Sequence, residues 1–291
     1  MDFQDCFVTP ASHKELAFEG TAGKKEAWQN GFLRAVDDDI EYPVADGIPD
    51  FTEMSKRTWS GGDADRTPRM DWIQSSWKDH LQTLREHHDH AYYSFARHIA
   101  ENPGLVLDIA SGPGGGAMPA LLFFDSKANI LMTDLGVSVL SLWQKHLDSM
   151  DVGENVSFAG MDVTVLPIRS KSMDYVTDSG GFGNVDNNNV ALAEAYRVLK
   201  SGGYLFLNDA ITEGLDQFPD EIYKDLVSKQ PHHEAGWEEL VRSCGFEVLE
   251  TNIWSQSRRR MKHDESDLGP LARKQDVEIY FTGFSLAAKK P

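Results

Sequence analysis

Short apolar runs alternate with segments of helical spacing along most of the chain after residue 75. Buried strands are predicted for the apolar runs at 105–107, 129–133, 155–158, 172–177 and 204–208. Between them, apolar residues recur with the period of an amphipathic helix, which predicts helices at 117–124, 137–150 and 187–199. Strands that alternate with helices in this way predict an α/β fold with a doubly wound, Rossmann-like sheet.

Patterns on either side of this region extend the predicted fold. A helix and two strands are predicted after it, at 235–244, 246–254 and 277–287. Before it, residues 75–100 carry apolar side chains at helical spacing and lead directly into the first strand. Tyr92 and Tyr93 lie on this predicted helix, where they either cover a bound ligand or simply pack on the sheet.

The N-terminal residues follow a different pattern. Short strands separated by turns are predicted there at 16–18, 31–33 and 39–42. A polar stretch rich in turn-forming residues follows at 57–75. We therefore expect three parts, namely a small β-rich appendage, a linker with a covering helix, and a ligand-binding domain, at 1–56, 57–100 and 101–291.

The candidate chemistry begins at the turn after the first buried strand, where the sequence is Asp108-Ile-Ala-Ser-Gly112-Pro-Gly-Gly-Gly116. A glycine-rich turn between a strand and a helix lets backbone N–H groups approach a ligand closely, and the helix N-terminus adds a positive field. Dinucleotides and S-adenosylmethionine (SAM) are both bound by such turns. Asp108 would repel a pyrophosphate, whereas the sulfonium and ammonium groups of SAM tolerate a carboxylate.

Acidic residues also follow the next two strands. Asp134 lies about 20 residues beyond the glycines, a spacing that suits hydrogen bonds to a ribose diol in either NAD or SAM. After the third strand, Asp162 is placed to accept from an adenine amino group, and Val163 to pack on the ring. These positions predict a nucleoside site at the carboxyl ends of the strands.

Residues 101 to about 210 resemble the class I SAM-dependent methyltransferases. The resemblance rests on the glycine turn, on the acids that follow it, and on Arg-Val-Leu-Lys-Ser-Gly-Gly at 197–203 before an apolar strand. The usual first motif of the family is Asp-x-Gly-x-Gly-x-Gly, and Ala110 replaces its first glycine here. The resemblance implies a seven-stranded sheet and SAM as cofactor. It implies cofactor contacts from Asp108, Ala110, Gly112, Gly114, Asp134, Leu135, Asp162, Val163, Asp178, Ser179 and Tyr92.

The segment at 42–51 resembles the end of the zinc-ribbon domain of methyltransferase activators. The four cysteine positions of that domain fall here on Thr9, Ser12, Ala35 and Asp38, so a thiolate zinc site cannot form and no metal is expected. We favour a structural role for this part, with a substrate or partner role as the alternative.

The acceptor of the methyl group is less well defined. A phenol or alcohol acceptor benefits from a general base, for which His232 and His233 are candidates, with Tyr223 orienting a polar substrate; a plain loop role for the histidines is the alternative. The Asn-Pro-Pro-Tyr motif of amino-methyltransferases is absent, because 178–183 is Asp-Ser-Gly-Gly-Phe-Gly. We expect a small-molecule acceptor methylated on O, S or N.

Two other groups of charged residues have weaker interpretations. His87 and His90 form a conceivable metal pair on the predicted helix 75–100, although a solvated helix face is favoured. The basic segment at 258–262 is predicted to be a surface loop, with attraction of an anionic substrate as the alternative.

Composition limits the partners and the location. The formal charge of −18, from 28 basic and 46 acidic residues, argues against nucleic acid and anionic membranes as partners. Cys6 and Cys244 show no paired spacing, and the chain lacks a signal-peptide pattern, so we expect a cytoplasmic protein. The oligomeric state is left open. Besides a methyltransferase, a SAM-binding regulatory or scaffold subunit and an NAD-dependent oxidoreductase remain as hypotheses.

Overall fold

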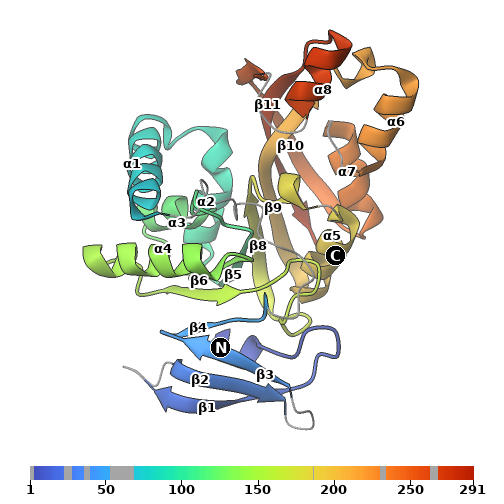
Figure 1. The fold of residues 1–291 in the computed structure, drawn as a ribbon. Coiled ribbons are helices and arrows are strands. Elements are labelled where there is room, and N and C mark those ends of the chain that lie inside the picture. Colours follow the sequence, from blue (N-terminus) through green and yellow to red (C-terminus); the bar gives the residue numbers. More distant parts are fainter. Residues whose placement is uncertain are drawn as a thin grey trace.

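The computed structural model describes residues 3–22, 28–35, 40–52, 69–185, 187–229, 234–262 and 268–291. A seven-stranded sheet forms its centre (Figure 1). In spatial order its strands are β10 (Glu247–Arg260), β11 (Tyr280–Lys289), β9 (Leu199–Glu213), β8 (Met173–Ser179), β5 (Leu105–Ile109), β6 (Asn129–Asp134) and β7 (Val156–Gly160). β11 runs antiparallel to both neighbours, and the pairs from β9 to β7 are parallel. The predicted doubly wound sheet is confirmed.

Helices cover both faces of this sheet (Figure 1). One face carries α1 (Met70–His87), α2 (Ser94–Glu101), α3 (Met118–Phe123) and α4 (Val137–Met150). The other carries α5 (Asn188–Val198) and α7 (Glu234–Ser243). Two helices that the sequence pattern did not predict, α6 (Asp220–Lys229) and α8 (Leu268–Gln275), lie beside the long ends of β9, β10 and β11.

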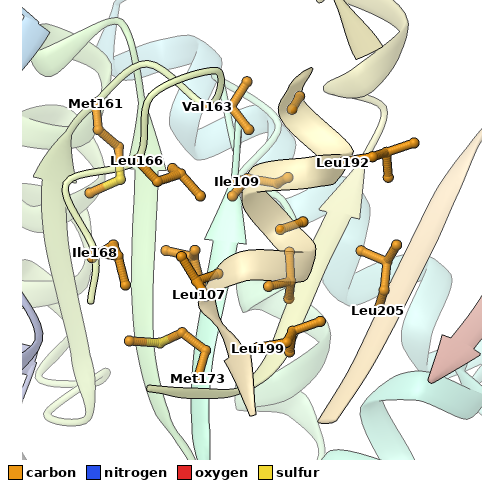
Figure 2. Packing of buried hydrophobic residues seen from close by; sticks show 14 of the residues in the cluster. Leu107, Ile109, Met161, Val163, Leu166, Ile168, Met173, Leu192, Leu199 and Leu205 are labelled. Carbon is orange, nitrogen blue, oxygen red and sulfur yellow. The ribbon is translucent and has the colours of Figure 1, made fainter. Parts of the chain in front are cut away.

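Strand β5 shows how the sheet separates two hydrophobic layers. All its residues are buried, as expected for a central parallel strand. Successive side chains point to opposite faces, so Leu107 and Ile109 enter the layer under α5 while Val106 enters the layer under α2, α3 and α4. Figure 2 shows Leu107 and Ile109 packed among residues of the first layer. The carboxyl end of β5 is thereby held between two close-packed layers.

The N-terminal strands form a separate small sheet that shares the main core. Its strands are β1 (Leu16–Ala22), β2 (Trp28–Ala35), β3 (Glu41–Ala45) and β4 (Ile48–Pro49). Phe7 pairs with Ile168, Asp50 pairs with Gly160 at the edge strand β7, and Phe51 joins the main hydrophobic cluster. The appendage is therefore fastened to the edge of the central sheet.

The positions that would hold zinc in the related ribbon are occupied differently. The hydroxyl groups of Thr9 and Ser12 lie 2.6 Å apart in one hydrogen bond, and Thr9 Oγ1 also accepts from the backbone N–H of Lys14. Ala35 is buried, and Asp38 lies outside the described residues. In the described ranges, no group of three or more His, Cys, Asp or Glu side chains is placed to hold a metal ion.

Two elements differ from the sequence prediction. The helix expected at 75–100 is broken between α1 and α2 by a 3-10 turn, Ala91–Tyr93, because His90 adopts an extended ψ of 142° and accepts from Tyr92 N–H. The basic segment expected as a loop belongs mostly to β10. There Arg258 pairs with Glu213 at 2.9 Å and Arg260 with Glu278 at 2.6 Å, which neutralises the charges.

The predicted linker at 57–75 falls largely outside the described residues, which resume at 69. Among the helices that the structure describes, none combines the length and apolar character needed to cross a membrane.

Candidate functional site

Asp108 holds the glycine-rich turn together from inside. Its carboxylate is 0% exposed and accepts from Ser111 Oγ at 2.8 Å, Thr177 Oγ1 at 2.7 Å and Ala117 N at 3.2 Å. Burial raises the pKa of Asp108 to about 6, although these hydrogen bonds oppose the shift. These hydrogen bonds of the Asp108 carboxylate go to the turn and to β8, and the cofactor contact that the resemblance implies for this residue stays a prediction.

The alanine that replaces the first family glycine is accommodated by a second glycine. Ala110 has a φ of +49°, in the left-handed region that normally favours glycine. A side chain at Gly181 would lie 2.5 Å from the Ala110 Cβ, so the loop after β8 leaves the space that Ala110 fills. The departure from the family motif is therefore compensated inside this chain.

Asp134, a buried residue at the end of β6, lies against Gly112 of the turn. The Asp134 carboxylate accepts from Gly112 N at 2.8 Å and from Gly136 N at 2.7 Å, and burial raises its pKa. Leu135 follows, half-buried. A side chain at Gly114 would meet nothing within 4 Å, so open space lies in front of the turn. Open space beside an acid and exposed glycine backbone fits the ribose and methionine parts of SAM.

The loop after β7 carries Asp162 and Val163. Asp162 Oδ1 accepts from Thr164 N at 2.9 Å and Thr164 Oγ1 at 2.7 Å, which closes a local turn. Val163 is 9% exposed and belongs to the hydrophobic layer that also holds Ile109 (Figure 2). The predicted contacts of both residues with adenine stay predictions.

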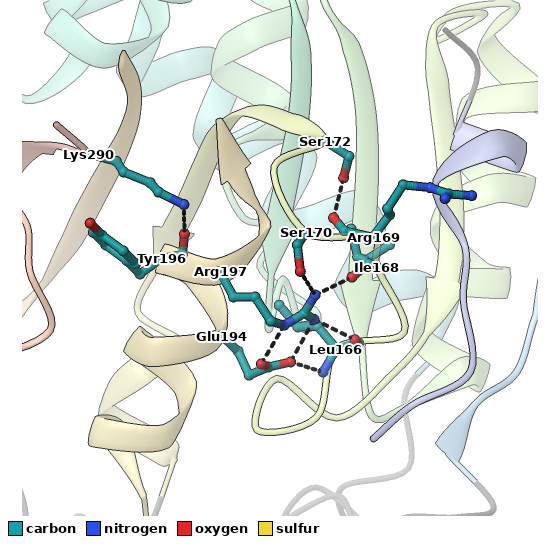
Figure 3. Close-up of polar contacts among 9 residues, drawn as sticks. All are labelled: Leu166, Ile168, Arg169, Ser170, Ser172, Glu194, Tyr196, Arg197 and Lys290. Carbon is teal, nitrogen blue, oxygen red and sulfur yellow. Dashed lines mark hydrogen bonds and ion pairs between the residues drawn. The ribbon is translucent and has the colours of Figure 1, made fainter. Parts of the chain in front are cut away.

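The motif at 197–203 holds this loop in place. Arg197 donates to Leu166 O at 2.9 Å and Ile168 O at 2.6 Å, and it pairs with Glu194, whose other oxygen accepts from Leu166 N (Figure 3). Lys290 donates to Tyr196 O of α5 (Figure 3). It also donates to Leu199 O, directly after that helix. The segment after β7 that contains Leu166 and Ile168 is thus fixed to α5.

Two acids influence each other beside the loop after β8: Asp178 is buried near the end of β8, and Asp209 is half-buried on β9. Asp178 Oδ1 accepts from Gly181 N and Phe182 N at 3.0 Å, and the next residue of that loop, Gly183, donates to Asp209 at 2.9 Å. The second oxygen of Asp178 has no hydrogen-bond partner within the described part of the chain. Burial, followed by the charge of Asp209, raises the pKa of Asp178 well above its ordinary value, and burial raises that of Asp209 to about 6.

We expect Asp178→Asn to stabilise the protein at neutral pH. A carboxyl group whose pKa is raised on folding stabilises the fold only while protonated, and this stability is lost as pH rises through the raised pKa. The side-chain oxygen of the asparagine keeps the hydrogen bonds from Gly181 N and Phe182 N. Its NH2 group takes the place of the unpaired carboxylate oxygen, so no buried charge remains at this position. At pH 7.5 the thermal midpoint should rise by about 2 °C or more, and the gain should shrink at pH 5.

Asp209→Asn is the matched control for this prediction. Both oxygens of Asp209 already accept backbone N–H groups, from Ala210 and Gly183, so an amide NH2 would face a donor. No comparable gain is expected from that variant. Equal stabilisation by both substitutions, or a gain for Asp178→Asn that does not depend on pH, would contradict the conclusion that the buried charge of Asp178 destabilises the fold at neutral pH.

A cavity of about 690 Å³ adjoins the glycine turn. It reaches Gly116 and Ser179, and it is covered by α1, the turn between α1 and α2, and strand β10. Tyr92 crosses it at one end, with its hydroxyl 3.4 Å from Ser179 Oγ, so these two predicted residues do meet. Its lining comprises Ser76, Asp79, His80, Thr83, His87, His90, Tyr92, Tyr93, Phe95, Gly116, Ala120, Ser179, Trp254, Gln256, Ser257 and Gly283.

Several lining residues were not singled out as site residues from the sequence. His80 Nε2 lies 2.9 Å from Gly114 O, which ties α1 to the glycine turn, and burial lowers the pKa of His80. Trp254 is the last residue of the strand predicted at 246–254, whereas Gln256 reaches the cavity because β10 extends beyond that predicted end. No local pattern marks Gln256, because the register of β10 with β11 shifts between Trp254 and Arg259.

Of the three predicted catalytic residues, the structure describes Tyr223. Tyr223 lies on α6 and packs against the small hydrophobic cluster that includes Leu215 and Phe218, and it is not among the residues that line the cavity. His232 and His233 lie outside the described residues. A catalytic role for any of the three stays a prediction.

Comparisons with known proteins agree with this geometry. A family model described as a methyltransferase domain matches residues 107–207. A ubiquinone/menaquinone biosynthesis C-methyltransferase of Xylella fastidiosa is 32% identical over 173 residues, which is 60% of this chain and 68% of that protein. A demethylmenaquinone methyltransferase of Bacteroides fragilis is 29% identical over 127 residues, 44% of this chain and 51% of that protein.

Similarity to a solved structure supports the fold. The crystal structure of a putative methyltransferase from Bacillus halodurans covers 68% of this chain and 98% of its own, with a TM-score of 0.51 and 20% identity. The chain belongs to the class I SAM-dependent methyltransferases, and SAM is its methyl donor.

Proposed function

We propose that this methyltransferase modifies a small, uncharged aromatic molecule bound in the cavity beside the glycine turn. The observation that carries the proposal is the position of the cavity, which touches both Gly116 of the turn and Ser179 at the tip of β8. In class I topology, the carboxyl ends of the strands form the ligand crevice. The cavity volume of about 690 Å³ also falls in the usual range for small-molecule sites.

The cofactor contacts in this proposal follow from the geometry of the strand ends. Gly112 and Gly114 would lie against the methionine and sugar, Asp134 would bind the ribose hydroxyls, and Asp162 would face the adenine. SAM supplies a methyl group that is already activated on a sulfonium. The remaining task of the chain is to hold an acceptor in line with that group, and such orientation supplies up to roughly 7–11 kcal/mol in favourable systems.

The character of the cavity wall indicates the acceptor. Its lining includes the aromatic side chains of Tyr92, Tyr93, Phe95 and Trp254, and neither lysine nor arginine contributes within the described residues. An anionic acceptor would therefore lack a charge partner there. One relative is named a ubiquinone/menaquinone biosynthesis C-methyltransferase, and another a demethylmenaquinone methyltransferase. Carbon thus joins O, S and N as a candidate acceptor atom.

The test combines cofactor binding with turnover. We expect calorimetry to detect binding of S-adenosylhomocysteine (SAH) but not of NADH by the full chain. Labelled SAM should then transfer its methyl group to 1-naphthol or 1,4-naphthohydroquinone, with Asp134→Ala as the control for cofactor-dependent transfer. Binding of NADH instead of SAH would overturn the cofactor assignment. Binding of SAH without transfer to either ring compound would favour a regulatory subunit.

A further inference from the structure

Two unrelated segments meet at one wall of the cavity. Trp254 and Gln256 of β10 both line it, as does His90 from the turn between α1 and α2. The His90 and Trp254 ring centroids lie 4.7 Å apart, and His90 Nε2 lies 2.9 Å from Gln256 Nε2. Residues about 160 positions apart in sequence thus build one polar and aromatic corner.

The hydrogen bonds of His90 determine how Gln256 is oriented. His90 Nδ1 accepts from Tyr92 N at 3.1 Å, so Nδ1 carries no proton and the neutral ring is protonated on Nε2. An Nε2–H group requires an acceptor. The Gln256 amide is therefore assigned the reversed orientation, in which its Oε1 takes the place of Nε2 and accepts from His90. The NH2 group of Gln256 is then left as a donor, with no other partner within the described residues.

A second donor beside this corner is also unsatisfied. The indole Nε1–H of Trp254 is shielded from solvent and has no acceptor in the part of the chain that the structure describes. Buried N–H groups are nearly always hydrogen-bonded, so an unpaired one beside a cavity points to a missing acceptor atom. The buried indole N–H and the NH2 group of Gln256, an exposed side chain that also lines the cavity, together favour a ligand that brings an oxygen to this corner.

The charge of the ligand is limited by the same wall. Among the described lining residues there is no cationic lysine or arginine, and the one carboxylate, Asp79, is exposed on α1. An anionic group would therefore be held only by neutral donors. A cationic group would face the Nε2–H of His90 and the NH2 of Gln256. A neutral carbonyl or hydroxyl oxygen suits these donors without needing a counter-charge.

We propose that Gln256, oriented by His90, binds a carbonyl or hydroxyl oxygen on the ring of the acceptor while Trp254 packs against that ring. This inference rests on the proposed function, since it assumes that the acceptor occupies the cavity. Gln256 is the specificity-determining residue, and His90 is a positioning residue that acts through it.

The test compares ligands that share one ring and differ in one group. With the chain saturated by SAH, we expect 1-naphthol to bind at least about tenfold more tightly than 1-methylnaphthalene, because only the hydroxyl meets the amide. It should also bind more tightly than 1-naphthoate and than 1-naphthylmethylammonium. Preference for either charged compound, or no preference for the hydroxyl, would overturn the inference.

Variants then assign the preference to residues. Gln256→Leu removes the amide but keeps a side chain of similar volume, and His90→Phe keeps a ring against Trp254. Both should lower the affinity for 1-naphthol about tenfold and leave that for 1-methylnaphthalene unchanged, a pattern that a loss of packing would not produce. Ser255→Ala, on an exposed neighbour outside the cavity lining, is the matched control and should keep the preference.

Titration of each variant with SAH separates the two levels of the proposal. Unchanged SAH affinity together with a lost hydroxyl preference supports the role of Gln256. Retention of the preference in Gln256→Leu overturns that role while leaving the methyltransferase assignment intact. Failure of the unmodified chain to bind SAH would instead remove the proposed function itself.

Discussion

Gly116→Ala is expected to destabilise the protein by roughly 3 kcal/mol or more, which lowers the thermal midpoint by about 6 °C or more. A Cβ at this position would lie 2.0 Å from Asp108 Oδ2, and the φ of +56° adds about 1–2 kcal/mol of left-handed strain. Relief of the clash would push the Asp108 carboxylate away from Ser111 and Thr177 and leave buried groups unpaired. Thermal unfolding of the cofactor-free chain measures the effect.

Gly114→Ala is the matched control. The same methyl group is added two residues earlier in the same turn, yet nothing lies within 4 Å of the new Cβ. Its thermal midpoint should stay within about 2 °C of the unmodified chain. Similar losses in both variants would mean that the turn is sensitive to any added side chain, and the bracing role of Asp108 would then be wrong.

The central sheet was predictable from local patterns. Strand β5 is buried on both faces and reads as an unbroken apolar run, and α4 begins and ends as its helical spacing predicts. Asp134 and Gly112 were also placed together correctly, because their positions follow from parallel strands that end at one edge of a sheet. Periodicity and topology together are sufficient for this part of the site.

The cavity wall formed by His90, Trp254 and Gln256 was not predictable in the same way. His90 interrupts a helical pattern by capping the backbone of Tyr92, a local hydrogen bond that hydrophobic spacing does not reveal. Gln256 lies where the register between β10 and β11 shifts, between Trp254 and Arg259, and such an irregularity follows from the pairing of two strands rather than from local spacing. The orientation of Asp108 depended on Thr177 of another strand. Each of these features is set by contacts between segments distant in sequence.

Asp134→Ala is expected to weaken SAH binding at least roughly thirtyfold, equivalent to about 2 kcal/mol. Two effects act in the same direction. The carboxylate orders the turn through Gly112 and Gly136, and its remaining lone pairs are positioned for the ribose hydroxyls in the proposed site. Isothermal titration with SAH measures their sum, and thermal unfolding without ligand reports the loss of turn order alone.

An analogue separates the direct contact from the ordering of the turn. SAH without its ribose 2′ and 3′ hydroxyls should bind the unmodified chain more weakly than SAH does, whereas Asp134→Ala should bind the two ligands almost equally. Such non-additivity is expected when two groups touch, and it is absent when one acts on the other only through the turn. If both chains discriminate equally between the ligands, Asp134 does not contact the ribose. Its part in cofactor binding would then be limited to holding Gly112.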